Sequence, residues 1–178
     1  NDSLRASEYL AKFSRLIWMI IEKAAQREIS LYDELARLTY YLELEKERFK
    51  NKFSYEIIID PSIKTEELLI PNMIIQPYVE NCILHGILPK HEPGHLRISF
   101  FMDGNKSLKI SIEDDGVGLI KASEKLKAGH KSLATGTIKT ILDINSRLSG
   151  KKQVVHMTDR STLDPSKQGT LIEITLEL

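Results

Sequence analysis

Apolar residues in the first part of the chain recur every three or four positions, as they do on one face of an α-helix. Between residues 3 and 25 this pattern predicts an amphipathic helix. A second helix is predicted from Ser30 to about Lys50, because Ser30 can cap the first turn while Asp33 and Glu34 complement the helix dipole. Residues 1–52 carry no chemical signature of their own, and the helix pair favours packing against another helix or subunit.

From Phe53 the pattern changes to that of β-strands. Runs of β-forming residues predict strands at residues 53–60, 67–70, 96–102, 108–113, 153–158 and 170–177. Asp103-Gly104-Asn105-Lys106 is typical of a hairpin turn between the two strands that flank it. Further helices are expected at residues 71–86 and 136–148, a lid-like loop at 115–135 and a polar connection at 158–169. The sequence therefore predicts an α+β fold, a two-layer α/β sandwich over residues 53–178 with a mixed sheet and helices on one face. Residues 1–52 would precede it as a helical segment.

The predicted helix at residues 71–86 combines a core face with polar residues. Its expected core positions are Ile75, Val79, Cys82 and Ile83. Tyr78, Asn81 and His85 lie together on another face, since residues three and four apart are neighbours on a helix. Gly86 is expected to end the helix in a left-handed turn. One short helix would thus present an amide and an imidazole side by side.

The amino-acid composition excludes several classes of function. The 178 residues contain 25 Lys and Arg against 25 Asp and Glu, so no overall charge attracts nucleic acid or an anionic membrane. The one cysteine, Cys82, excludes an internal disulfide and a cysteine-based zinc site. The longest apolar run, residues 16–21, is too short to span a bilayer. Because the chain begins with Asn rather than Met, we expect it to be a piece of a longer protein.

A second candidate site follows a predicted strand. Asp114-Asp115-Gly116-Val117-Gly118 places a carboxylate at a strand end, beside glycines that allow a ligand to approach the backbone. An Asp-x-Gly-x-Gly string alone is a weak signal. The order of the motifs is more specific. The string follows a helix that carries Asn81, and it precedes a lid, a second helix and the Gly169-Thr170 pair at the start of the last strand.

In this order of motifs the chain resembles the ATP-binding domain of sensor histidine kinases, whose superfamily also contains gyrase and the MutL repair proteins. The strings PNMIIQPYVENCILHG and LARLTYYLELEKERF resemble the membrane-associated LytS-type kinases in particular, and the resemblance covers nearly the whole chain. It implies a Bergerat-type ATP-binding fold that uses ATP and Mg²⁺.

The resemblance also implies roles for residues on the helix and the lid. Asn81 would hold the Mg²⁺ that bridges the ATP phosphates, as a hard amide oxygen can alongside waters and phosphates. His85 would lie near the phosphates, and Gly136 matches one glycine of the lid. Glu80 lies about 100° around the helix from Asn81, and we expect it to be structural rather than a catalytic base. No residue is assigned as catalytic with certainty, and Asn81 and His85 are the candidates.

On the adenine side, the resemblance implies that Asp115 accepts a hydrogen bond from the adenine amino group. Gly116 and Gly118 would shape the pocket wall, and the Thr170 hydroxyl would support the adenine side. The lid departs from the family pattern, because residues 134–137 retain one glycine and the Arg-Leu pair occurs late, at residues 147–148. Leu84 and Trp18 also replace residues that are basic in many relatives. These departures would weaken ATP affinity or turnover.

The phosphorylated histidine of the family is expected upstream of this chain. Family members carry it in a helical Pro-His-Phe-like segment, and none of the five histidines, His85, His91, His95, His130 and His156, stands in such a context. We therefore expect a cytoplasmic catalytic domain that binds nucleotide but does not autophosphorylate alone. Its parent would be a homodimer in the cytoplasmic membrane, anchored through upstream segments, and would pass phosphate to a response regulator.

Two alternatives remain open at this point. One is a degenerate module of the same fold that dimerises or binds a partner without using ATP. The other is an ATP hydrolase of the same superfamily. Those hydrolases place a water-activating Glu one helical turn before the Asn, where this chain has Pro77, so hydrolysis is disfavoured.

Overall fold

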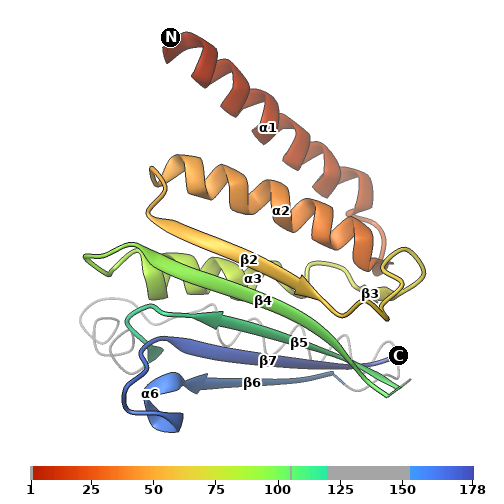
Figure 1. The fold of residues 1–178 in the computed structure, drawn as a ribbon. Helices are drawn as coiled ribbons and strands as arrows, with labels where there is room; N and C mark the ends of the chain where they lie inside the picture. The colour runs from red at the N-terminus through yellow and green to blue at the C-terminus, as the bar shows by residue number, and fades with distance from the viewer. Residues whose placement is uncertain (1, 105, 120–152) are drawn as a thin grey trace. The chain divides into compact units, whose positions relative to one another are not determined.

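The computed structural model describes residues 2–104, 106–119 and 153–178. The helix predicted at residues 136–148, the candidate Gly136 and the lid departures lie outside the described residues. The described elements are α1 (Asp2–Lys23), β1 (Glu28–Ser30), α2 (Leu31–Arg48), β2 (Phe53–Ile59), β3 (Leu69–Pro71), α3 (Gln76–Asn81), the π-helix η1 (Cys82–Ile87), β4 (Gly94–Asp103), β5 (Ser107–Asp114), β6 (Gln153–Asp159), α6 (Arg160–Leu163) and β7 (Thr170–Glu177) (Figure 1).

The chain divides into two compact units. The helical unit comprises Asn1–Asn51 and Lys64–Ile74, and the sheet unit comprises Lys52–Ile63 and Ile75–Leu178. The chain thus returns to the helical unit after β2, whereas the sequence predicted one boundary near residue 52. The simple division into residues 1–52 and 53–178 stays a prediction.

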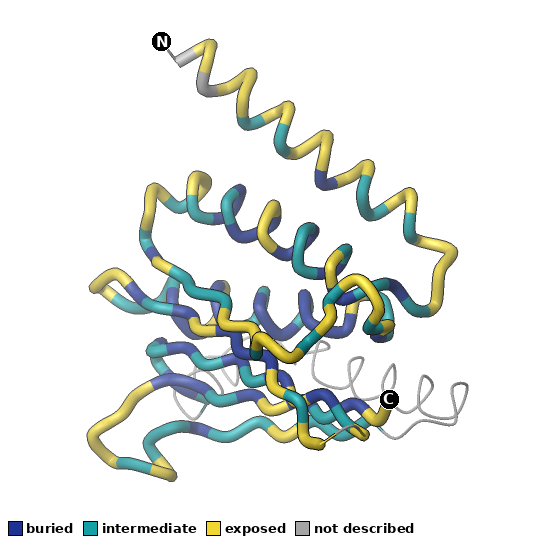
Figure 2. Tube along the Cα trace, turned by 45° about the vertical axis from the view of Figure 1, so that its right-hand side comes forward, coloured by how far each residue is buried: buried dark blue, intermediate teal, exposed yellow. Residues whose placement is uncertain are grey.

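In the helical unit, both predicted helices are present. The Ser30 hydroxyl accepts a hydrogen bond from the Asp33 N–H at 3.1 Å, which confirms the predicted cap of α2. α1 packs against α2 but remains exposed along most of its length, whereas α2 has a buried stripe (Figure 2). Large apolar side chains of α1 are exposed at Leu4, Leu10, Phe13, Ile17, Trp18 and Ile21.

A two-stranded ribbon completes the helical unit. β1 pairs antiparallel with β3, with Ile29 opposite Ile70. The short strand β3 was predicted at residues 67–70, whereas its partner β1 had no periodic signal. After β3, the Asn72 amide donates hydrogen bonds to the carbonyl oxygens of Lys23 at 2.8 Å and Gln26 at 3.0 Å, and accepts one from Arg37 at 2.8 Å.

The sheet unit contains a five-stranded mixed sheet in the order β2-β4-β5-β7-β6. β2 runs parallel to β4, and the other neighbours are antiparallel. Alternate residues of the strands form a buried apolar face, which includes Leu96, Ile98 and Phe100 on β4, Leu108, Ile110 and Ile112 on β5, and Ile172, Ile174 and Leu176 on β7. η1 lies against β4 and β5 on this sheet, as the parallel crossover from β2 to β4 requires.

The helix after β3 departs from its predicted end. The four expected core residues are buried, with Ile75, Val79 and Ile83 at 0% exposure and Cys82 at 3%. Gly86, however, does not end the helix in a left-handed turn, because it lies inside the π-helix η1 and its φ is not positive. Tyr78, expected beside Asn81 and His85, is itself buried.

The connection at residues 158–169 is also more regular than its polar sequence indicates. β6 extends to Asp159, whose side chain caps the short helix α6. Gly169, in the left-handed region with φ +108°, then leads into β7.

Candidate functional site

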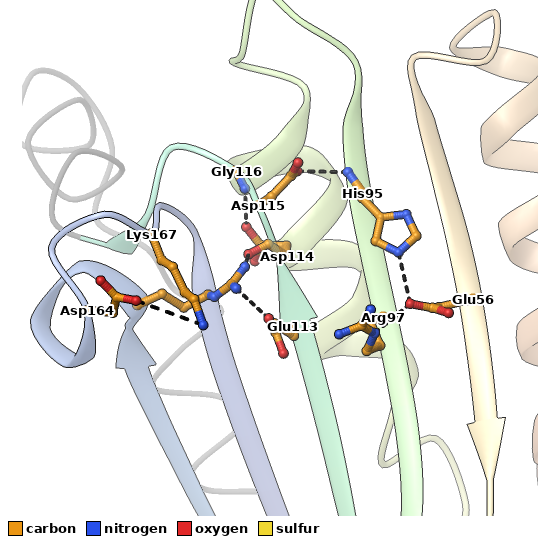
Figure 3. A network of polar contacts seen from close by, with 10 residues as sticks. Glu56, His95, Arg97, Glu113, Asp114, Asp115, Gly116, Asp164 and Lys167 are labelled. Carbon is orange, nitrogen blue, oxygen red and sulfur yellow. Dashed lines mark hydrogen bonds and ion pairs between the residues drawn. The ribbon is translucent and has the colours of Figure 1, made fainter.

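The candidate site lies where η1, the end of β5 and the start of β7 meet. The strand alternation that buries Ile110 and Ile112 also turns Asp114 to the inner face of the sheet, where it is 0% exposed. Figure 3 shows the two aspartates at the end of β5 with different partners, Asp114 with Gly116 and Asp115 with His95.

Asp114 is a buried carboxylate with one oxygen available. Its Oδ1 accepts a hydrogen bond from the Gly116 N–H at 2.8 Å. In the part of the chain that the structure describes, its Oδ2 is buried and has no hydrogen-bond partner at ordinary geometry. Burial raises the pKa of this carboxyl above its usual 3.8, while the hydrogen bond from Gly116 and the interactions with Cys82 and Thr170 oppose the rise. An oxygen of this kind is suited to accept a hydrogen bond from a ligand.

Two glycines allow the backbone to close around this carboxylate. A Cβ on Gly86 would lie 2.8 Å from Asp114 Oδ1, and a Cβ on Gly116 would lie 2.4 Å from the Gly86 oxygen. The Val117 N–H donates to that same oxygen at 2.9 Å. η1 and the loop after β5 therefore meet backbone to backbone.

Asp115, by contrast, is tied to the neighbouring strand. Its Oδ1 accepts a hydrogen bond from the His95 N–H at 2.7 Å, and its Oδ2 lies 3.1 Å from Lys90 Nζ. The Asp115 side chain is 41% exposed. Both of its oxygens are thus engaged within the protein. Its role as the adenine acceptor stays a prediction, and the geometry favours Asp114 for that role.

The other predicted residues divide into two groups. Thr170 is 5% exposed, interacts with the Asp114 carboxyl and stands opposite Asp159 in the sheet. Gly118 has φ +82°, and a Cβ there would lie 2.7 Å from Asp159 Oδ2. Thr170, Gly116 and Gly118 are therefore brought together around the end of β5.

Asn81 and His85 lie on the continuous helix formed by α3 and η1. Asn81 is half-buried at the junction between the two, and His85 is exposed on η1. π-Helical turns occur often at functional sites. The neighbouring Glu80 accepts a hydrogen bond from Gln76 Nε2 at 2.9 Å, in keeping with the structural role expected for it.

Sequence reasoning missed three residues that contact this site. Asp114 was overlooked in favour of Asp115, although the alternation of β5 and the Asp-x-Gly-x-Gly spacing both point to Asp114. Cys82 was assigned to the core, yet its thiol also interacts with the Asp114 carboxyl. Arg160 Nη1 donates to the Asp114 carbonyl oxygen at 2.9 Å, and no sequence signal marked that residue.

Two further observations bear on the class of site. Among the described residues, no group of three or more His, Cys, Asp or Glu side chains could hold a metal ion. Over the same residues, no helix has the length and apolar character that crossing a membrane requires.

Comparison with known proteins gives concordant results. A family model described as Histidine kinase matches residues 1–53. The sensor protein LytS of Staphylococcus epidermidis is 30% identical over 173 residues, which cover 96% of this chain and 28% of that protein. The chain therefore spans less than a third of that relative.

Solved structures show the same fold. The histidine kinase domain of the blue-light activated histidine kinase from Erythrobacter litoralis EL346 matches with a TM-score of 0.53 at 14% identity, over 97% of this chain and 74% of that one. Histidine kinase ThkA, in complex with the response regulator protein TrrA, matches with a TM-score of 0.53 at 18% identity, over 96% of this chain and 48% of that one. These comparisons confirm the predicted resemblance and the predicted fold class.

Proposed function

Because the chain is homologous to the LytS sensor histidine kinases and has a histidine kinase fold, we propose that it is the ATP- and Mg²⁺-binding catalytic domain of a two-component sensor histidine kinase. It would supply the γ-phosphate that phosphorylates a histidine in another part of the parent protein. A response regulator would then receive the phosphate, by analogy with the complex of ThkA with the response regulator protein TrrA. The parent is expected to be a dimer in the cytoplasmic membrane.

The observation that carries this proposal is the buried Asp114 Oδ2, which has no hydrogen-bond partner among the described residues. Leaving a buried acceptor without a donor costs free energy, and a ligand that supplies the donor would remove that cost. The exocyclic amino group of adenine is a donor of the right kind. Gly116 and Gly86 keep the backbone close at this point, and no side chain from either residue fills the space beside the carboxylate.

The remaining roles follow the resemblance. Asn81 would ligate Mg²⁺ through its amide oxygen, with waters and phosphates as the other ligands, as is common for this ion. His85 would lie near the phosphates, and Thr170 would support Asp114 from β7. Gly136 is proposed as a lid residue from its sequence position alone. Asp115 remains a second candidate for the acceptor of the adenine amino group. It is the weaker candidate because both of its oxygens already have partners in the protein.

The proposed domain would position the nucleotide and stabilise the charge of its phosphates, and it would form no covalent bond itself. Mg²⁺ neutralises charge on the phosphates when bound, and the protein holds the nucleotide so that an acceptor histidine can approach the γ-phosphate. None of the five histidines of the chain lies in α1 or α2. We therefore expect this chain to bind nucleotide without phosphorylating itself.

Two other functions are weaker. A non-catalytic module would be favoured by the lid departures and by Leu84, but it gives no role to the Asp114 oxygen that lacks a partner among the described residues. A hydrolase needs a water-activating carboxylate one turn before Asn81, where Pro77 stands. Glu80, the residue before Asn81, already accepts a hydrogen bond from Gln76.

Calorimetric titration of the 178-residue chain with ATP and ADP, with and without Mg²⁺, tests the proposal. We expect saturable binding that Mg²⁺ strengthens and that Asp114→Asn weakens. Absence of binding at millimolar nucleotide would favour the non-catalytic module. Steady release of phosphate from ATP would favour the hydrolase.

A further inference from the structure

The connection between β6 and β7 contacts the loop after β5 at both of its ends. Two consecutive residues make these contacts, Asp159 at the end of β6 and Arg160 at the start of α6. Asp159 lies beside Gly118, where a Cβ would come within 2.7 Å of its Oδ2. Arg160 contacts Glu113 and Asp114, the last two residues of β5, where the loop begins.

Arg160 is held by three separate acceptors. Its backbone N–H donates to the Gly169 carbonyl oxygen at 2.9 Å, its Nη1 donates to the Asp114 carbonyl oxygen at 2.9 Å, and its Nη2 lies 2.5 Å from Glu113 Oε1. The Arg160 side chain is 16% exposed, so solvent screens these contacts little. The guanidinium therefore joins the β6–β7 connection to the last two residues of β5.

The local sequence explains why Arg160 occupies this position. The Asp159 carboxylate accepts hydrogen bonds from the Ser161 N–H at 3.0 Å and the Ser161 hydroxyl at 2.6 Å, and this cap starts α6 at Arg160. Gly169 permits the close approach from the other side, because a Cβ there would lie 1.9 Å from the Asp114 carbonyl oxygen. The cap and the glycine together bring Arg160 to the Asp114 backbone.

We propose that Arg160 is a positioning residue for the nucleotide base, which fixes the Asp114 backbone so that the buried carboxylate presents its unpartnered Oδ2 to the adenine amino group. This inference rests on the proposed function. It assigns the β6–β7 connection to the adenine side of the site, and it does so through the contacts of Arg160 with Asp114 and Glu113. Arginine suits the role better than lysine because its planar fork reaches a carbonyl and a carboxylate at once.

The test compares two nucleotides on the full chain and on three variants, Arg160→Ala, Arg160→Lys and Arg97→Ala. One nucleotide is ATP, and the other is purine riboside 5′-triphosphate, which lacks the amino group that Asp114 would bind. Arg97 is the control, because its 2.5 Å ion pair with Glu56 joins β4 to β2 rather than β5 to the β6–β7 connection. Thermal unfolding of each variant is measured in parallel.

We expect Arg160→Ala to weaken ATP binding by about tenfold, the scale of one charge-assisted hydrogen bond, and to weaken binding of the purine analogue less than about twofold. Arg160→Lys should recover part of the ATP preference, and Arg97→Ala should retain all of it. A merely structural role would instead lower stability and reduce both affinities in proportion.

The outcomes separate this inference from the proposed function. If the unaltered chain binds ATP and Arg160→Ala keeps the full preference for ATP over the analogue, the positioning role is overturned while the proposed function stands. Equal losses for both nucleotides, or the same loss in Arg97→Ala, would overturn it as well. If the unaltered chain binds neither nucleotide, the proposed function fails and this inference fails with it.

Discussion

Gly116 is in direct contact with the backbone of Gly86: a Cβ on Gly116 would lie 2.2 Å from the Gly86 carbonyl carbon and 2.4 Å from its oxygen. Neither atom can move like the end of a flexible side chain, because both belong to the helical backbone of η1. Any side chain at residue 116 must therefore separate the loop after β5 from η1.

The first prediction follows from this contact. Gly116→Ala should destabilise the fold by about 1–3 kcal/mol, the usual cost of overpacking, and should abolish measurable ATP binding because Asp114 is displaced. Chemical unfolding and calorimetric titration measure the two effects. Gly104→Ala is the control, since its φ of +60° makes it strained but a Cβ there meets nothing within 4 Å. It should cost stability and leave ATP binding unchanged; loss of binding in both variants would argue against a local effect.

The second prediction distinguishes the two aspartates. Asp114→Asn should weaken ATP binding by about tenfold or more, because the variant replaces a carboxyl acceptor at a buried site by a neutral amide. Asp115→Asn should weaken it by less than about threefold, since it removes a partly exposed contact with Lys90. Titration of both variants under the same conditions makes the comparison. The reverse order of effects would restore Asp115 as the base acceptor.

The strands of the sheet and the buried face of the helix formed by α3 and η1 were predicted because each has a local periodic pattern. The hairpin was predicted from its turn residues. The continuation of that helix through Gly86 was not predictable from local rules. A glycine near a helix end usually serves as a left-handed cap, and here the approach of Asp114 and Gly116 from a distant strand keeps it helical instead.

The choice between Asp114 and Asp115 shows a different limit. Two adjacent carboxylates at a strand end look alike in sequence, and only the phase of the alternation separates them. Leu108, Ile110 and Ile112 set that phase, so the inward position of Asp114 was available from the pattern. The partners of Asp115 could not be predicted, because His95 on β4 and Lys90 in the loop before β4 approach Asp115 only when β4 pairs with β5.

The third prediction concerns pH. The pKa of Asp114 is raised in the folded chain by burial, so the folded state binds a proton more tightly than the unfolded state does. The contribution of Asp114 to stability therefore falls as pH rises above 3.8, the usual value, and this cost persists at neutral pH. Asp114→Asn should remove the cost and be at least as stable as the unaltered chain at pH 7.

Chemical unfolding of both proteins between pH 4 and pH 7 measures this difference. The comparison cancels the carboxyls of Glu56, Asp60 and Asp164, whose pKa values are lowered by hydrogen bonds and which contribute with the opposite sign. If the stability difference between the two proteins does not change with pH, Asp114 does not titrate as its burial implies.

The fourth prediction concerns the helical unit. Asn72→Ala should destabilise the chain by about 1–3 kcal/mol, because it leaves the carbonyls of Lys23 and Gln26 and the buried Arg37 guanidinium without the Asn72 amide as partner. Asn72→Asp keeps an oxygen for Arg37 but loses both N–H donors. Its stability should therefore lie between that of Asn72→Ala and that of the unaltered chain. Chemical unfolding measures both variants. A cost below about 0.5 kcal/mol in Asn72→Ala would show that water replaces the amide there.

The last prediction uses Cys82 as a reporter of the site. Burial, together with the neighbouring Asp114, raises the pKa of this thiol well above its usual 9.0, and only the thiolate reacts with thiol reagents. At pH 8 the native chain should therefore be labelled about tenfold or more slowly than the chain in denaturant. Because Cys82 is the one cysteine in the sequence, the signal belongs to this residue alone.

ATP should slow the labelling further. A nucleotide that engages Asp114 stabilises the closed arrangement of η1 and β5, and Cys82 is reached only when that arrangement opens. The protection should disappear in Asp114→Asn, where ATP binds weakly, and should persist in Asp115→Asn. Native labelling as fast as in denaturant would mean that the thiol is not buried against Asp114, and protection by ATP in Asp114→Asn would place the nucleotide elsewhere.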